Sequence, residues 1–345
     1  MFLPGTYQVT LALMILSMLC WGSWANTLKL CPGFRFQLFY WDYALGLLGG
    51  AVVLGLTAGS LGHSGQAFLT AIAHSSLTII LWAFFGGVIF NVANLLLVAA
   101  IDVAGLAVAF PVGIGLALVV GAVSSYLVSP AANPVLLFGG VSLVTLAIIL
   151  DAMAYRKREG SAEATGAPTD SSVGSNSTTR GIVLSLVAGV LMGSFYPLVA
   201  HAMRGPDSPG PYAIAFFFAI GVLISTIPAN LLLMARPLDG KPPADGADYW
   251  RASMGWHAAG ILGGAIWCVG AVANFVASGA HLVGPAVSYS IGQGATMVSA
   301  LWGVFVWREF AGAPRAARIL LVLMFVFFLL GLTAVALAPL YWRPA

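Results

Sequence analysis

The chain has 345 residues, of which 60% are hydrophobic and only 7% are charged, and its formal net charge is +3. Soluble domains carry roughly 25% charged residues, so this composition excludes an ordinary soluble domain and predicts an all-α polytopic membrane protein. No basic run is dense enough to indicate a nucleic-acid partner, and the three cysteines have no metal or redox spacing.

Apolar stretches of about 20 residues, the length that crosses a bilayer as a helix, recur along the whole chain. The first one lacks the basic region and the small-residue cleavage site of a signal peptide, so we predict that it is retained as a membrane-spanning helix. The ten predicted spans are 7–27, 38–59, 77–100, 105–128, 134–155, 180–202, 211–235, 257–279, 283–307 and 316–340.

A polar stretch divides these spans into two sets of five. Residues 160–179 are rich in Gly, Ser, Thr and Ala and predict a flexible linker between a first repeat, 1–159, and a second repeat, 180–345. Of the fourteen Lys and Arg residues, all but Arg204 and Arg343 fall on the side of the membrane that carries the linker. The positive-inside rule therefore predicts a cytoplasmic linker and two outside termini in a multi-pass plasma (inner) membrane protein.

The two halves resemble each other in sequence. AVAFPVGIG at 107–115 matches AVSYSIGQG at 286–294, Gly86-Gly87 matches Gly263-Gly264, and Gly22-Ser23 matches Gly193-Ser194. Because each half has an odd number of predicted spans, the second half must be inverted relative to the first. A 5+5 inverted repeat is typical of carriers that work by alternating access and bind their solute between the repeats.

The first half offers five candidates for solute contact. Trp21 and Trp24 share a helix face and suit stacking on a ring or a sugar plane, although tryptophan also anchors helices at membrane interfaces. Asn26 follows them, and Asn91 and Asn94 present two amides on one side of span three. These amides suit hydrogen bonds either to a polar solute or to another helix.

The second half offers a larger set of polar and aromatic candidates. Tyr289, Gln293 and Thr296 have i, i+4, i+7 spacing, so they share one face if 283–307 forms a single helix. Gln293 corresponds to Ile114 and Thr296 to Ala117, and this asymmetry favours solute contact over helix packing. The remaining candidates are Tyr196, Trp267 and Asn274.

Asp42 stands among aromatic residues at the start of the second predicted span. A carboxylate at that depth either carries a coupling proton or pairs with a nearby cation, and Lys29 and Arg35 are the nearest in sequence. Both interpretations remain open at this point.

The sequence contains none of the patterns that membrane enzymes need. There is no metal-ligand spacing, no nucleophile elbow and no phosphate-binding loop, and the five histidines are dispersed. We therefore expect no catalytic residues, no metal and no cofactor.

In the order of these motifs along the sequence, the chain resembles the drug/metabolite transporter superfamily. Within it, the chain is similar to the plant ureide permeases and to the bacterial glucose and rhamnose uptake proteins. The resembling stretches are GSWANTLK at 22–29, WDYALGLL at 41–48, FGGVIFNVANLLLVAAIDVAGLAVAFPVGIG at 85–115, GIVLSLVAGVLMGSFYPL at 181–198 and GQGATMVSALWGVFVWREF at 292–310.

The resemblance implies a 5+5 carrier of a small polar metabolite, often proton-coupled, with its cavity between the halves. The chain departs from the plant permeases in its short linker, which lacks their phosphate-loop-like motif, so nucleotide regulation is not expected. We expect a secondary transporter of an uncharged ureide, nucleobase or sugar, with an exporter of aromatic compounds or a non-transporting membrane scaffold or sensor as alternatives. The expected partners are the solute, the bilayer, protons and, as a further option, a second copy in a homodimer.

Overall fold

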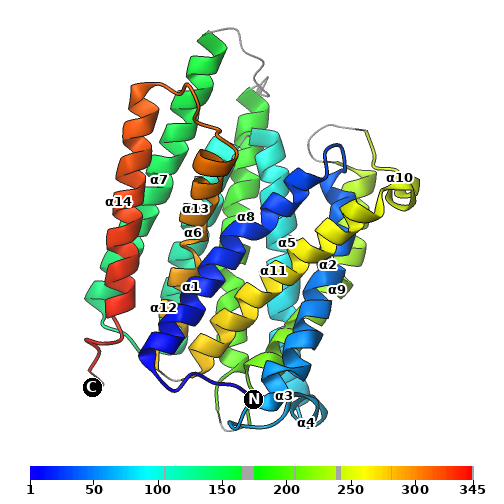
Figure 1. Cartoon of the computed structure of the whole chain (residues 1–345), viewed down its shortest axis with the longest axis vertical. Helices are drawn as coiled ribbons and strands as arrows, with labels where there is room; N and C mark the ends of the chain where they lie inside the picture. Colours follow the sequence, from blue (N-terminus) through cyan, green and yellow to red (C-terminus); the bar gives the residue numbers. More distant parts are fainter. Residues whose placement is uncertain (105, 165–174, 206, 238–241, 281, 344–345) are drawn as a thin grey trace.

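A computed structural model of the chain describes residues 1–104, 106–164, 175–205, 207–237, 242–280 and 282–343. Within these ranges every regular element is a helix, and the long helices lie side by side in one bundle (Figure 1). Nine helical segments of the described chain are long and apolar enough to cross a membrane. The prediction of an all-α polytopic membrane protein is therefore confirmed.

The first half holds five long helices and three short elements. They are α1 (Tyr7–Ser23), the 3-10 helix η1 (Trp24–Leu30), α2 (Phe36–Leu56), α3 (Ala58–Leu61), α4 (Phe68–Ala73), α5 (Leu77–Ala104), α6 (Leu106–Val128) and α7 (Pro134–Ala164). The second half holds α8 (Ser175–Ala202), α9 (Pro211–Ala235), α10 (Gly246–Arg251), α11 (Met254–Gly279), α12 (Pro285–Gly292), α13 (Ala295–Leu301), the π-helix η2 (Trp302–Val306) and α14 (Arg315–Leu337).

The helix boundaries follow local sequence signals. The Thr6 side chain accepts a hydrogen bond from the Val9 amide and caps α1, and Ser253 caps α11 in the same way. Pro211 and Pro285 occupy the first positions of α9 and α12, where a missing amide hydrogen costs nothing. In lipid, such caps matter because water is not there to satisfy the end groups of a helix.

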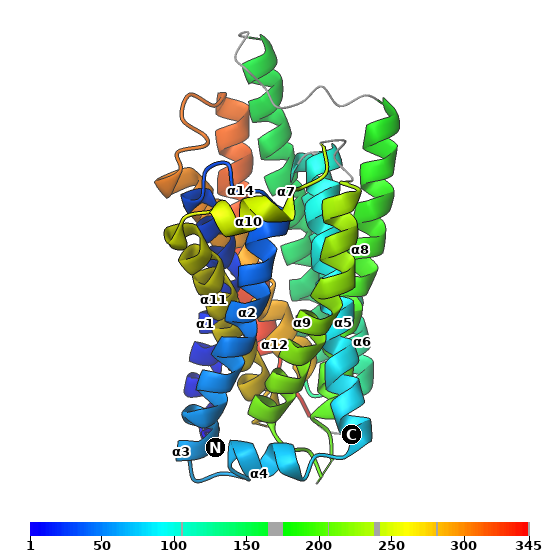
Figure 2. The ribbon, with the colours of Figure 1, turned by 90° about the vertical axis from the view of Figure 1, so that its right-hand side faces the viewer.

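The region predicted as a linker is partly helical. α7 continues to Ala164 and α8 begins at Ser175, so both helices extend into 160–179. The remaining part, 165–174, lies outside the described residues. The ends of α7 and α8 that face this segment lie opposite the two chain termini (Figure 2).

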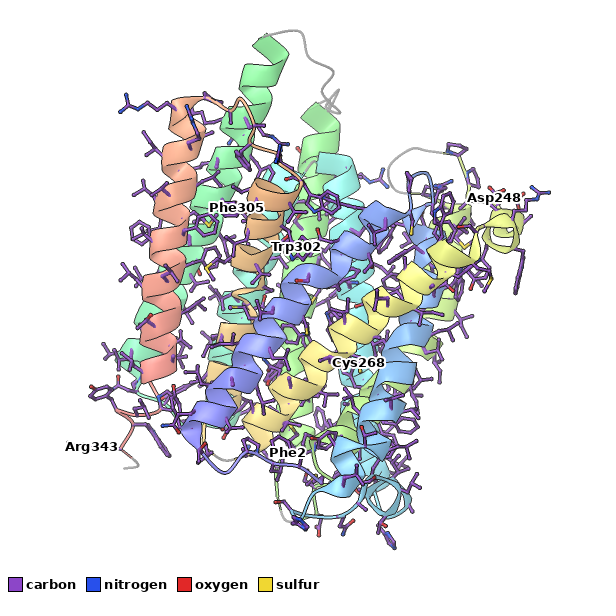
Figure 3. All side chains as sticks on the ribbon, in the orientation of Figure 1. Phe2, Asp248, Cys268, Trp302, Phe305 and Arg343 are labelled. Carbon is purple, nitrogen blue, oxygen red and sulfur yellow. The ribbon has the colours of Figure 1, made fainter. Side chains whose placement is uncertain are left out.

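The charge count predicts that both termini lie at one end of the bundle and the loop near Asp248 at the opposite end. Phe2 and Arg343 lie at the end that carries both termini, and Asp248 lies at the other end (Figure 3). Which end faces the cytoplasm stays a prediction from the loop charges.

Most of the major helix packing joins one half of the chain to the other. α5 packs on α8 and α9, α11 packs on α1 and α2, and α7 packs on α14. α6 likewise packs on α8 and α12, while α1 packs on α12 and α13. The two halves are therefore interleaved and share one bundle.

Glycines bring helices of different halves into backbone contact. Between α2 and α11, a Cβ atom at Gly46 would lie 2.0 Å from the Ile261 carbonyl oxygen. A Cβ atom at Gly264 would lie 1.9 Å from the Tyr43 carbonyl oxygen. Only glycine permits helix backbones to approach so closely.

The same pair of contacts occurs between α9 and α5. A Cβ atom at Gly221 would lie 2.1 Å from the Phe84 carbonyl oxygen, and one at Gly87 would lie 2.0 Å from the Phe218 carbonyl oxygen. The α9 residues follow their α2 counterparts by 175 positions, and the α11 residues follow their α5 counterparts by 177. The sequence match of the paired glycines thus corresponds to equivalent contacts in the two halves.

The first helix of each half also makes an equivalent glycine contact with the other half, α1 with α13 and α8 with α6. A Cβ atom at Gly22 in α1 would lie 2.5 Å from the Ala295 carbonyl oxygen, and one at Gly193 in α8 would lie 2.9 Å from the Ala117 carbonyl oxygen. Ala117 and Ala295 therefore hold equivalent positions in these two contacts. The sequence match instead aligns Ala117 with Thr296, one residue further along.

Replacing Gly264 by alanine is expected to destabilise the protein. The added methyl group would overlap the α2 backbone, and overpacking of this kind costs about 1–3 kcal/mol. The measurement is the melting temperature of the purified protein in detergent. Gly49→Ala is the matched control, because no atom lies within 4 Å of a Cβ at this α2 position. Equal melting temperatures for the two variants would contradict the prediction.

Candidate substrate-binding site

The segment 283–307, predicted as one continuous helix, is broken in the structure. α12 ends at Gly292 and α13 begins at Ala295, and η2 follows as a π-helix. At the break, the Gly294 amide donates to the Ile291 carbonyl at 2.9 Å and the Thr296 amide to the Gln293 carbonyl at 3.3 Å. These bonds reach back three residues and not four, so the turn is tightened. The prediction of a continuous helix is wrong because two glycines with poor helix propensity flank Gln293.

A row of aromatic rings lies against this break. A Cβ atom at Gly292 would lie 2.6 Å from the six-membered ring of Trp21 on α1, so the absence of a side chain leaves room for the indole. Trp21 stacks on Trp267 of α11 with 5.7 Å between ring centroids and 18° between planes. Trp267 in turn stacks on Phe218 of α9 at 5.8 Å and 8°. The row therefore crosses from one half of the chain to the other.

The side chains of Trp21, Gln293 and Thr296 make no hydrogen bond to a described residue, and the Trp21 Nε1 atom lies on the side of the ring that faces Gly270 of α11. The Trp21 Nε1 atom is buried and has no acceptor. Gln293, with 8% of its surface exposed, and Thr296, with 3%, make no side-chain hydrogen bond to any described residue. Buried donors and acceptors are normally paired, so these groups are candidates for contact with a ligand. The structure brings the predicted Trp21 and Trp267 into contact and packs Trp21 on Gly292, the residue before Gln293.

Asn274 is the centre of a saturated hydrogen-bond network. Its amide donates to the Ser17 hydroxyl at 3.0 Å and the Ser288 carbonyl at 2.9 Å, and its oxygen accepts from the Tyr196 hydroxyl at 2.5 Å. Tyr196 packs on Tyr289 at 5.0 Å, and the Tyr289 hydroxyl donates to the Ala117 carbonyl at 3.1 Å. Asn274, Tyr196 and Tyr289 therefore hold α1, α8, α11, α12 and α6 together by direct contacts.

A second hydrogen-bond network joins α2, α5 and α9. The Tyr40 hydroxyl donates to the Asn91 side-chain oxygen at 2.8 Å and accepts from the Asn94 amide at 3.0 Å. The Asn91 amide donates to Ser225 at 2.9 Å, and Thr226 donates to the Asn91 oxygen at 3.3 Å. The two amides predicted on one side of span three thus meet protein groups.

Trp24 and Asn26 lie in η1, after the end of α1. The Trp24 ring packs on the Tyr43 ring at 4.7 Å. The Asn26 amide donates to the Ser23 carbonyl at 3.0 Å, and its oxygen accepts from the Trp307 indole at 2.6 Å. These two candidates are engaged with the neighbouring α2 and with the segment after η2.

Asp42 is buried and both of its carboxylate oxygens are occupied. Oδ1 accepts a hydrogen bond from the Tyr249 hydroxyl at 2.7 Å, and Oδ2 lies 2.7 Å from the His257 Nδ1 atom. Burial and the hydrogen bond to Asp42 raise the pKa of Tyr249. The alternative pairing with Lys29 or Arg35 is wrong, because Lys29 pairs with Glu309 and Arg35 donates to the Pro242 carbonyl.

Several residues of the site and its supports were missed by the sequence analysis. His257 is one of the five dispersed histidines, and neither Ser17 nor Ser288 was a candidate from the sequence. Their partners lie far away in sequence, for example 215 residues for His257 and Asp42. Spacing within one helix carries no signal for such contacts. Within the described residues, no group of His, Cys, Asp or Glu has the geometry to hold a metal ion.

Comparisons with known proteins place the chain in a family. The family model described as Ureide permease matches residues 39–165 and 169–338. Ureide permease 2 of Arabidopsis thaliana is 24% identical and aligns with 95% of this chain and 96% of its own length. Ureide permease 4 of the same organism is 25% identical over 91% and 93%.

A solved crystal structure gives independent support for the fold alone. It matches 94% of this chain and 96% of its own chain with a TM-score of 0.57 at 15% identity. The family model covers both halves from residue 39 onward, so α1 and η1 precede the matched region. The chain belongs to the ureide permease family.

Proposed function

We propose that the protein is a secondary transporter that moves a small, uncharged ureide or nucleobase across the membrane by alternating access. The observation that carries this proposal is the interruption of the helix at Gln293, next to which Gly292 packs on Trp21 in a row of stacked aromatic rings from both halves. Broken helices near the interface of two repeats are the usual binding sites of secondary transporters. The names of the relatives favour ureides as the solute class.

The equivalent glycine contacts support the 5+5 inverted repeat. In this arrangement α1, α2, α5, α6 and α7 correspond to α8, α9, α11, the α12–α13 segment and α14. The contact of α2 with α11 then becomes the contact of α9 with α5 under exchange of the halves, and Gly46 and Gly264 become Gly221 and Gly87. Two such halves have two equivalent ways to tilt against each other, which is the basis of alternating access.

The chemistry of the unpaired groups suits a planar amide solute. Such a solute offers carbonyl oxygens to the Trp21 indole donor, and Gln293 can both donate to and accept from an amide edge. The faces of Trp21 and Trp267 suit stacking on a flat ring. Thr296 adds a hydroxyl that can donate or accept. A hexose also stacks on tryptophan, but its many hydroxyls need more partners than these three groups provide.

The remaining candidates are assigned to holding the site. Because Asn91, Asn94, Tyr196, Asn274 and Tyr289 are already paired with protein groups, we infer that they fix the helices around the solute. Trp24 and Asn26 are assigned to the contact between η1 and the segments beside it. From the loop charges we propose that the protein lies in the plasma membrane with both termini outside. The homodimer remains a proposal from the sequence.

Purified protein in liposomes is expected to accumulate radiolabelled allantoin or uracil when the outside is more acidic than the inside. The measurement is uptake over time, with protein-free liposomes and labelled glucose as comparisons. Uptake of glucose in place of the ureide would support the sugar alternative, and outward movement only would support an exporter. No movement of any of these solutes would favour a scaffold or sensor.

Gln293→Leu is expected to abolish the thermal shift that the transported solute produces. Leucine keeps the side-chain volume near that of glutamine but removes both hydrogen-bonding groups, so the apo protein should melt near the wild-type temperature. The comparison is a thermal-shift titration with allantoin, uracil, xanthine and hexoses. Ser299→Ala, at an exposed position on α13, is the control. An unchanged solute response in Gln293→Leu would assign the glutamine to packing.

Asp42→Asn is expected to uncouple solute movement from the proton gradient. We propose the Asp42–His257 pair as the coupling site, since the carboxylate is 3% exposed and its partner is a histidine on the facing helix. Gradient-driven accumulation should fall to the level of passive exchange, while exchange of labelled for unlabelled solute continues. Asp248→Asn, which changes an exposed carboxylate, should leave both unchanged. Full accumulation by Asp42→Asn would exclude this residue as the coupling site.

A further inference from the structure

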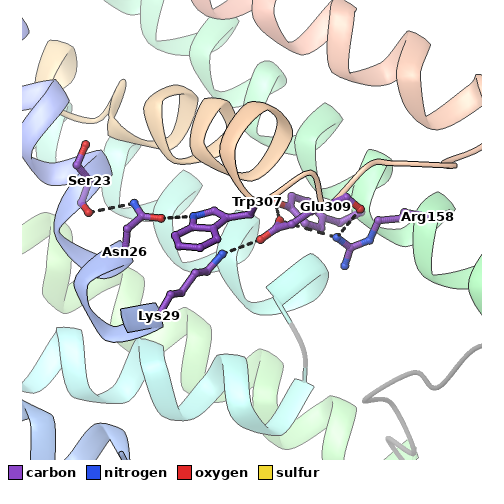
Figure 4. Close-up of polar contacts among 7 residues, drawn as sticks. Ser23, Asn26, Lys29, Arg158, Trp307 and Glu309 are labelled. Atoms are coloured by element: carbon purple, nitrogen blue, oxygen red, sulfur yellow. Dashed lines mark hydrogen bonds and ion pairs between the residues drawn. The ribbon is translucent and has the colours of Figure 1, made fainter. Parts of the chain in front are cut away.

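Glu309, three residues after the end of η2, joins its own segment to η1 and α7 (Figure 4). Its Oε1 atom accepts from Lys29 Nζ at 2.7 Å, and its Oε2 atom accepts from the Tyr155 hydroxyl at 2.8 Å. The Arg158 guanidinium lies 3.8 Å from Oε2 and donates to the Glu309 backbone carbonyl at 3.3 Å. Lys29 ends η1, and the other two partners belong to α7.

A row of contacts fastens η1 to η2 beside this carboxylate. A 3-10 helix has three residues per turn, so Asn26 and Lys29 of η1 share one face, and Ser23, the residue just before η1, continues that row. The Ser23 hydroxyl accepts from the Trp302 indole at 2.9 Å, and the Asn26 oxygen accepts from the Trp307 indole at 2.6 Å. Lys29 Nζ also lies 4.8 Å from the centre of the Trp307 ring. Lys29 therefore stays on Glu309 only while this face of η1 is docked.

Asp151 is a second carboxylate on the side of α7 that faces Glu309. It precedes Tyr155 by one helical turn, so the two side chains share a face. Asp151 is 7% exposed, and its Oδ1 atom is buried without a hydrogen-bond partner among the described residues. A buried, unpartnered carboxylate oxygen is costly when ionised, and a bound proton removes most of that cost.

Few other charged residues lie on α7 or on the helices that pack against it. α7 itself supplies Arg158, while Arg156 and Lys157 point to solvent. α14 packs on α7, and its two basic residues, Arg315 and Arg318, are exposed. α6 also packs on α7 and has no acidic or basic residue over 106–128. Arg308, next to Glu309 in the chain, is also exposed. Of the two described cations that pair with Glu309, Arg158 lies on α7 with Asp151, and Lys29 lies on η1.

The docked lysine keeps Glu309 ionised. Burial raises the pKa of the Glu309 carboxyl, but hydrogen bonds from Lys29 and Tyr155 and the charges of Lys29 and Arg158 outweigh this effect. The pKa of Glu309 therefore lies below its ordinary value. With a lowered pKa, the ion pair persists at neutral pH and is lost only as the pH falls through that lowered value.

We propose that Asp151 and Glu309 form a proton-binding site that is distinct from Asp42 and takes up one proton when η1 undocks. Undocking moves the Lys29 ammonium into solvent and removes one positive charge from two neighbouring carboxylates. One proton from the same aqueous phase binds to a carboxylate oxygen and restores the charge. No covalent bond between heavy atoms changes. The undocking motion rests on the proposed alternating-access function, whereas the site itself is a property of the folded chain.

Labelling with dicyclohexylcarbodiimide tests the site without any transport, because this reagent modifies protonated carboxyl groups in apolar surroundings. The full-length protein in detergent is treated at neutral pH, and modification of Asp151 and Glu309 is quantified by peptide mass spectrometry. We expect Lys29→Ala to raise labelling by about tenfold, the change in protonated fraction that one pKa unit produces. Lys29→Arg should label like the wild type. Exposed Asp248 serves as the internal control.

A second variant tests docking without changing any charge. Asn26→Ala removes the acceptor of the Trp307 indole and should raise labelling in the same direction as Lys29→Ala, provided that both variants elute as monodisperse protein. Wild-type labelling of both carboxylates in both variants would overturn the proposal. Because no solute is involved, this result is separate from the liposome experiment, which can fail or succeed independently.

Discussion

Close contact between helix backbones at Gly46, Gly87, Gly221 and Gly264 is the constraint on which the bundle depends. In a bilayer there is no water to drive helices together, so their association relies on close packing and on hydrogen bonds between them. Glycine supplies the first by removing the side chain that would keep two backbones apart. Each of these four residues packs on a helix of the other half, so the contacts that build the bundle also interleave the halves.

This packing also brings polar residues of different helices within hydrogen-bonding distance. Where α2, α5 and α9 pack closely, Asn91 and Asn94 both hydrogen-bond to Tyr40. Asn274 is paired in the same way with Ser288 of α12. Close packing does not pair every polar group, since the Tyr43 hydroxyl in α2 and the Asn230 side-chain oxygen in α9 are buried without a partner among the described residues. What distinguishes Gln293 is that the helix is interrupted there.

Sequence alone predicted the membrane helices and the glycine match well, because both depend on local composition or on direct comparison of the halves. It failed where long-range contacts decide the outcome. Hydropathy does not reveal the break at Gln293, since 283–307 is apolar throughout and its glycines are compatible with a kinked helix. The partner of Asp42 was misjudged because His257 is distant in sequence. The sequence match also placed Thr296 opposite Ala117, whereas the glycine contacts place Ala295 there.

The break at Gln293 and the cluster at Glu309 lie on one short stretch of chain. α13 spans only Ala295–Leu301 and continues into η2, and Trp307 and Glu309 follow the end of η2. Under the proposed function, a solute beside Gln293 would contact the start of α13. The far end of the same stretch contacts Ser23 at the end of α1 and Asn26 and Lys29 in η1. We therefore propose that a displacement at the solute position is transmitted along this stretch to the contact between the halves, and that the charge balance of Asp151 and Glu309 changes with it.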